Sequence, residues 1–131
     1  MTMATRGLVF LGLVMISLVP MASAIAGTAT FYTVYVPSAC YGFQDQGVMI
    51  AAASDALWNN GAACGKMYRV SCTGPTNQGV PRPCKGGSVT VKIVDRCPSP
   101  GCQATLDLSQ QAFSQIADTN AGKIQIDYNP I

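Results

Sequence analysis

The chain has 131 residues, of which 49% are hydrophobic and 11% charged, and its formal net charge is +2. A chain of this length forms one domain, and so weak a charge builds no basic face of the kind with which nucleic-acid-binding proteins displace counterions from phosphate. Histidine and glutamate are absent, which excludes histidine-type zinc sites and histidine-based nucleophile triads and makes every side-chain carboxylate an aspartate. We therefore expect no nucleic-acid partner.

The amino-terminal segment 1–24 is predicted to be a secretory signal peptide. Arg6 precedes an uncharged apolar run over 7–19, which is too short to cross a bilayer of about 30 Å as a helix. The small residues Ala-Ser-Ala at 22–24 fit the rule for signal cleavage, so we expect cleavage after Ala24 and a mature, secreted domain over 25–131. A membrane anchor is the alternative, but no stop-transfer charges or longer apolar run follow, and we expect no membrane insertion.

Alternation of apolar and polar residues predicts strands along most of the mature chain. Runs rich in β-branched and aromatic residues, separated by Gly, Pro and Asn, predict strands over 27–36, 49–53, 67–72, 88–95 and 123–128. A small domain with many short strands is best closed as a barrel, because closure leaves no exposed strand edge.

One helix interrupts these strands. Ser109 is a good N-cap, Phe113, Ile116 and Ala117 fall at helical spacing after it, and Gly122 follows near the expected end. A shorter helical turn is expected over 54–58. The stretch between the third and fourth strands shows no periodicity and predicts a surface loop.

Six cysteines lie in the mature domain. An even number in a small exported domain indicates three disulfides, although the count leaves their pairing open. A zinc site is the alternative, but the C-x-x-C pairs that it needs are absent, and we expect no metal ion and no cofactor. The six are Cys40, Cys64, Cys72, Cys84, Cys97 and Cys102.

Three segments resemble known families. They are GTATFY over 27–32, ALWNNGAACG over 56–65, and TLDLS over 105–109 followed by Phe113 and Ile116. Together they resemble the expansin N-terminal domain and the family-45 endoglucanase-like domain across the whole mature chain. The short length and the VDRCPSPGC stretch are most similar to the plant natriuretic peptides, also called endoglucanase-45-like domain-containing proteins.

The resemblance implies an all-β fold, a six-stranded double-psi β-barrel with one or two short helices and three disulfides. It also implies how the cysteines pair. By the expansin pattern Cys40 joins Cys64 and Cys72 joins Cys84, which leaves Cys97 and Cys102 as the third pair.

The resemblance further implies a groove lined by Thr30, Tyr32, Asp95 and Asp107. Asp107 matches the position of the proton donor of the family-45 cellulases. Most glycoside hydrolases need a second carboxylate roughly 5 to 9.5 Å from the first. In those cellulases it follows the T-x-Y strand motif, where this chain has Thr33 and then Val.

We therefore expect no hydrolase and no catalytic residue, with Asp107 as a vestigial acid. The same departure occurs in expansins, which loosen walls without measurable hydrolysis. A lytic transglycosylase needs only one acid, so the departure makes ordinary hydrolysis improbable without excluding every cleavage reaction.

Each of these residues has a structural alternative. Asp107 could be a cap or turn residue before the helix, and Asp95 could form a salt bridge or turn bond at a strand end. Tyr32 is favoured for the groove because Phe31 and Tyr35, on the other face, can supply the core. The single tryptophan, at position 58, fits core packing better than stacking on a sugar.

Two functions fit the sequence. The first is a non-catalytic, monomeric protein of the apoplast that acts through a cell-surface receptor, as the resemblance to plant natriuretic peptides implies, with a systemic role in water and solute homeostasis. In that family the active region corresponds to residues 31–66 here. The second is a wall protein that binds, loosens or cleaves polysaccharide in the groove, with weak affinity because few aromatic side chains are available.

Overall fold

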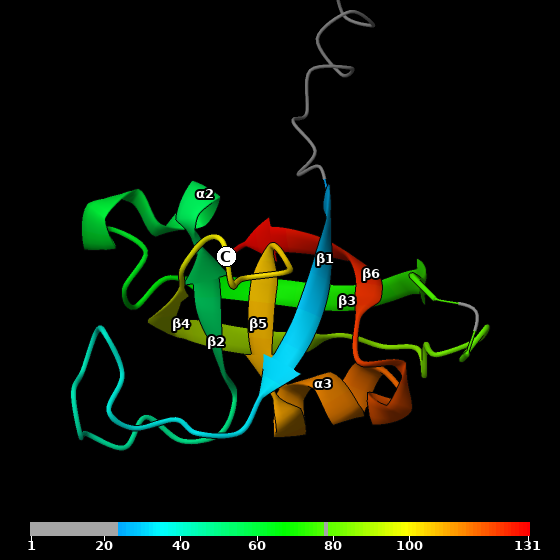
Figure 1. Cartoon of the computed structure of the whole chain (residues 1–131), viewed down its shortest axis with the longest axis horizontal. Helices are drawn as coiled ribbons and strands as arrows, with labels where there is room; N and C mark the ends of the chain where they lie inside the picture. The colour runs from blue at the N-terminus through cyan, green and yellow to red at the C-terminus, as the bar shows by residue number, and fades with distance from the viewer. Residues whose placement is uncertain (1–23, 78) are drawn as a thin grey trace, which may run out of the picture.

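The computed structural model describes residues 24–77 and 79–131. Its six strands close into a barrel in the order β1–β5–β2–β4–β3–β6 (Figure 1). The predicted signal peptide lies outside the described residues except for Ala24, and it stays a prediction. The strands are β1 Ile25–Tyr32, β2 Ile50–Ser54, β3 Met67–Pro75, β4 Val89–Cys97, β5 Leu106–Ser109 and β6 Ile124–Pro130.

The barrel mixes two kinds of strand pairing. β1 pairs in parallel with β5, and β2 pairs in parallel with β4, whereas the other four pairs are antiparallel. Parallel neighbours cannot be joined by a tight turn, and neither parallel pair is consecutive in the chain: β3 lies between β2 and β4 in sequence, and three strands lie between β1 and β5. The six-stranded all-β barrel that the resemblance implies is confirmed.

The core follows the alternation that the sequence shows. Val91 and Ile93 of β4 and Ile124 and Ile126 of β6 are almost wholly buried, and the residues between them are more exposed. Phe113 fills the end of this core with no exposed surface, its ring centroid 5.0 Å from that of Phe31. The predicted inward faces of these two strands are confirmed.

The helices are short, as expected. They are α2 Asp55–Trp58, the 3₁₀ turn η2 Asn59–Gly61, α3 Gln110–Ile116 and the 3₁₀ turn η3 Thr119–Ala121. Within the part of the chain that the structure describes, no helix is long and apolar enough to cross a bilayer.

Ser109 caps α3, because its hydroxyl accepts a hydrogen bond from the Ala112 N–H at 3.0 Å. The predicted end of this helix is wrong. α3 stops at Ile116 because Ala117 is extended, with φ −156°, and forms a bridge with Cys84. Gly122, with φ +70°, ends η3 instead.

Two strand predictions also need correction. Periodicity did not predict β5, because four residues with one aspartate give too short a pattern. β1 ends at Tyr32 rather than at residue 36, since its parallel partner ends opposite Tyr32, at Ser109. Val34, which the prediction placed in the strand, is 74% exposed.

The three disulfides pair as the resemblance implies. The Cα atoms are 5.6 Å apart in Cys40–Cys64, 5.3 Å apart in Cys72–Cys84 and 5.1 Å apart in Cys97–Cys102. The first ties the long β1–β2 connection to the segment after η2. The second closes the loop after β3, and the third closes the loop after β4.

Candidate functional site

One row of residues crosses four neighbouring strands on the outer surface of the barrel. The pairing register places Thr30 of β1 opposite Asp107 of β5, Asp107 opposite Ala52 of β2, and Ala52 opposite Asp95 of β4. The residues that flank this row in sequence, such as Ala29 and Leu106, point into the core. We call Thr30, Asp107, Ala52 and Asp95 the acidic row.

A bulge puts Asp95 into this row. Ala51 pairs with Ile93, but the register then shifts by one residue, so that Ala52 pairs with Asp95 and Val94 is skipped. Because side chains alternate along a strand, an unbroken register would have put Val94 in the row and turned Asp95 away. The local irregularity therefore replaces an apolar side chain by a carboxylate.

Thr30 and Asp107 form the centre of the row. The Thr30 hydroxyl donates a hydrogen bond to Asp107 Oδ1 at 2.9 Å, between two partly buried side chains. Burial raises the pKa of Asp107, the Thr30 bond acts against this rise, and the charge of Asp95 adds to it. Asp107 is thus a carboxyl group that keeps its proton to a higher pH than a free aspartate does.

Asp95 is anchored to the backbone. Its Oδ1 accepts hydrogen bonds from the N–H groups of Ala39, at 2.9 Å, and of Arg96, at 2.8 Å. The Cα atoms of Asp95 and Asp107 are separated by two strand spacings, about 10 Å. Asp95 therefore provides a second carboxylate near Asp107, although the position after the T-x-Y motif holds none.

Tyr32 stands beside the row with a buried hydroxyl. That oxygen has no hydrogen-bond partner among residues 24–77 and 79–131. Burial raises the pKa of Tyr32 far above its usual value, and the charges of Asp95 and Asp107 raise it further. Its ring meets that of Tyr35 edge to face, with centroids 5.2 Å apart.

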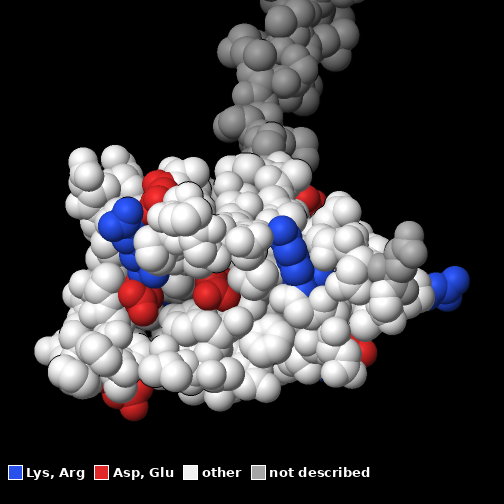
Figure 2. All heavy atoms as spheres, in the orientation of Figure 1, with Lys and Arg blue, Asp and Glu red and all other residues white. Residues whose placement is uncertain are grey.

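The structure thus brings together Thr30, Tyr32, Asp95 and Asp107, the four residues for which the family resemblance implies a groove. Figure 2 shows acidic side chains set in a hollow of this face, in the region of β2 and β5. The sequence analysis missed Ala52, whose small side chain separates the two aspartates. The only signal for it was the run of three alanines in β2.

The structure decides between the alternatives given for the two aspartates. Asp107 does not cap α3, because it lies within β5 and Ser109 is the cap. For Asp95 the salt bridge is wrong, whereas the local bond at the strand end is present, since Asp95 accepts from the Arg96 N–H. Its neighbour Arg96 makes the ion pair, with Asp55 at 2.8 Å, and the Ser99 N–H and Arg96 lower the pKa of Asp55.

The surrounding aromatic residues divide between core and surface. Trp58 is partly buried against the core, in agreement with the packing role favoured for it. Tyr35 does not belong to the core: its hydroxyl bonds Gln111 Oε1 and accepts from the Gln110 N–H at 3.1 Å. The described residues contain no group of three or more side chains suited to hold a metal ion.

Several known proteins are similar to this chain in sequence or in fold. The lytic transglycolase family, a double-psi β-barrel domain, matches residues 50–128. An EG45-like domain containing protein of Citrus jambhiri is 70% identical over 109 residues, which are 82% of this chain and 82% of that protein. EG45-like domain containing protein 2 of Arabidopsis thaliana is 45% identical over 87% of this chain and 86% of its own length.

The solved structures include an expansin. A mutant expansin of Clavibacter michiganensis in complex with cellohexaose superposes with a TM-score of 0.61 at 28% identity. The match covers 83% of this chain and 50% of the expansin, so this chain spans about half of that protein. The chain therefore belongs to the EG45-like domain-containing proteins, within the expansin-like double-psi β-barrel superfamily.

Proposed function

We propose that this protein is a secreted, cell-wall-related protein that holds a glucan chain along the acidic row without hydrolysing it. The row offers a hydroxyl, a carboxyl group of raised pKa and a second carboxylate on one open face. The complex of the related bacterial expansin with cellohexaose supports a glucan as the ligand. The predicted signal peptide supports a location in the apoplast.

The proposed lack of hydrolysis rests on one observation, the anchoring of Asp95. A hydrolase needs one carboxyl group to donate a proton and a second to activate water or attack the sugar. Asp107 suits the first role, but Oδ1 of Asp95 already accepts two backbone hydrogen bonds that hold the β1–β2 connection and the end of β4. We propose that this anchoring keeps Asp95 in a structural role, so that Asp107 acts without a partner base.

A retention assay with sugar analysis tests this proposal. The purified mature protein should be retained weakly on cellulose and should bind cellohexaose, and neither polymer nor oligomer should release reducing sugar. Asp107→Ala should weaken binding several-fold. Asp127→Ala, on the outer side of β6, is the matched control and should leave binding unchanged. Sugar release that depends on Asp107 would refute the proposal.

The β1–β2 connection supports a second candidate, a receptor-mediated role in water and solute homeostasis like that of the plant natriuretic peptides. This segment exposes large apolar side chains, with Phe43 80% and Val34 74% exposed. The connection is held in place by the Cys40–Cys64 disulfide and by Lys92, whose ammonium group lies over the Tyr41 ring at 4.7 Å. A fixed loop that presents apolar side chains is a typical protein-binding surface.

Protoplast swelling tests this second candidate with the full mature chain. Phe43→Ser should abolish any swelling response and leave binding of cellohexaose intact. Ile131→Ser, another change at an exposed apolar residue, is the control and should preserve the response. Equal swelling with both variants would exclude the loop as the active surface.

A further inference from the structure

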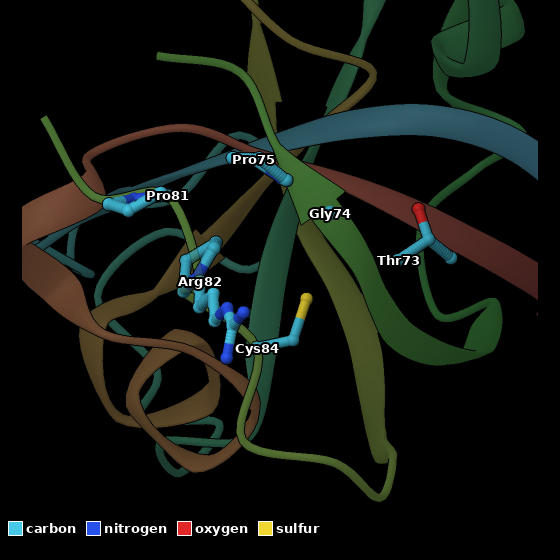
Figure 3. A pocket seen from close by; sticks show the side chains of 7 residues that line it. Thr73, Gly74, Pro75, Pro81, Arg82 and Cys84 are labelled. Carbon is cyan, nitrogen blue, oxygen red and sulfur yellow. The ribbon is translucent and has the colours of Figure 1, made fainter. Parts of the chain in front are cut away.

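A pocket of about 250 Å³ lies where β3 leaves the barrel, and none of its lining residues belongs to the acidic row (Figure 3). It lies between the end of β3 and the segment that returns toward β4. Its volume is near the lower limit for ligand pockets, so it accommodates about one ring-sized group. The lining residues are Thr73, Gly74, Pro75, Pro81, Arg82, Pro83 and Cys84.

The walls of the pocket are rigid and include three prolines. Figure 3 shows Pro75 on the β3 side and Pro81 on the returning segment, with Arg82 next to Pro81. The Cys72–Cys84 disulfide joins the two sides at the base. Proline rings have few conformations to lose on binding, so this shape exists before a ligand arrives.

Arg82 provides an unused charge. Among residues 24–77 and 79–131, its guanidinium has no ion-pair or hydrogen-bond partner, whereas the guanidinium of Arg96 is paired with Asp55. The nearby charged side chains are engaged elsewhere. Asp118 accepts from the Asn120 N–H at 2.9 Å, and Lys85 donates to the Ser114 carbonyl at 2.7 Å.

The Arg82 guanidinium and the proline rings together favour a ligand that carries both a carboxylate and a sugar ring. A guanidinium binds a planar carboxylate through two parallel hydrogen bonds. The single positive charge of Arg82 balances the one negative charge of a carboxylate but not the two of a phosphate monoester, so a carboxylate is the favoured ligand group. Proline rings offer flat apolar surface to the C–H face of a sugar ring. The rim residues Thr73, Pro75 and Pro81 are exposed, so the pocket admits a unit in the middle of a long chain.

We propose that this pocket binds a uronate unit of an acidic polysaccharide, with Arg82 paired to the carboxylate and the prolines packed against the sugar ring. The site goes beyond the proposed function, because it uses other residues and a charged polymer in place of a neutral glucan.

Binding of the full mature protein to polygalacturonate tests the site. Arg82→Gln should weaken binding at least fivefold, and Arg82→Lys should fall between this variant and the wild type, since lysine keeps the charge but loses the planar fork. Arg69→Gln is the matched control: Arg69 is an exposed arginine on the same strand as Thr73 that does not line the pocket, and its loss should change binding less than twofold.

Other ligands and variants separate the outcomes. Fully methyl-esterified polygalacturonate should not bind, because it lacks the carboxylates, and polyaspartate should compete poorly, because it lacks the sugar ring. Equal losses in Arg82→Gln and Arg69→Gln would show a non-specific charge effect and overturn the site, as would equal competition by polyaspartate. Asp107→Ala should keep polygalacturonate binding and Arg82→Gln should keep cellohexaose binding, so either proposal can fail alone.

Discussion

The substitution Thr30→Val tests whether the Thr30 hydroxyl is coupled to the charge of Asp107. It removes the hydroxyl that donates to Asp107 Oδ1 and nearly preserves the volume of the side chain. Thr28→Val is the matched control: Thr28 lies on the same strand and the same face, and its hydroxyl has no hydrogen-bond partner among the described residues.

The cost of Thr30→Val should depend on pH. A hydrogen bond to a charged group contributes about 2 kcal/mol and one to a neutral group about 1 kcal/mol. The variant should therefore lose about 2 kcal/mol of unfolding free energy when Asp107 is ionised and about 1 kcal/mol when it is protonated. The difference of about 1 kcal/mol corresponds to a further rise in the pKa of Asp107, because the Thr30 hydrogen bond that lowers this pKa is lost.

The direction of the pH dependence follows from burial. Burial raises the pKa of Asp107 in the folded state, so the folded protein keeps this proton to a higher pH than the unfolded chain does. Stability is therefore lost as the pH rises from the unfolded-state pKa through the folded-state pKa. Over this pH window Thr30→Val should lose more unfolding free energy than the wild type does. Asp107→Asn should lose none, because it has no carboxyl group to ionise at this position.

Urea unfolding followed by the fluorescence of Trp58 provides the measurement. Unfolding free energies at about pH 4 and pH 7 are compared for the wild type, Thr30→Val, Asp107→Asn and the double variant. In the Asp107→Asn background the cost of Thr30→Val should be the same at both pH values. An equal cost in the wild-type background would refute the coupling, as would an unchanged pH dependence in Asp107→Asn.

Three further predictions concern Tyr32, Ser109 and the six cysteines. Tyr32→Phe should keep or slightly raise the unfolding free energy, because it removes a buried hydroxyl without a described partner, and a loss above about 1 kcal/mol in urea unfolding would contradict this. Ser109→Ala should cost about 2 kcal/mol, since the hydroxyl both caps α3 and donates to the Val48 carbonyl, whereas the exposed-side control Ser114→Ala should cost less than about 0.5 kcal/mol. Mass spectrometry after alkylation of the denatured, unreduced mature protein should find no labelled cysteine, and a labelled thiol would break the assignment of three bridges.

Local patterns predicted much of the fold because each of them depends only on residues that are close together in sequence. The alternation in β4 and β6 follows from one buried and one exposed face, and Ser109 is recognisable as a cap because the helix begins directly after it. β5 was missed because its two leucines are too few to define a period. The double-psi topology came from resemblance, since alternation does not determine which strands pair.

The resemblance suggested the members of the candidate site, but not how they are arranged. Asp107 was equally consistent with a cap or a groove, and only the parallel pairing of β1 with β5 decides between them. The position of Asp95 depends on a one-residue bulge and on the N–H of Ala39, which lies 56 residues away in sequence. Neither the bulge nor the hydrogen bond from Ala39 produces a pattern in the local sequence.

The place of β1 in the barrel has a consequence for biosynthesis. The first strand has both of its neighbours, β5 and β6, in the last quarter of the chain. Until those residues have left the ribosome, β1 has nothing to pair with, so the sheet cannot close during synthesis and folding is expected to be slow for a chain of this size. Translocation across a membrane in an extended form, before folding, is therefore compatible with this topology.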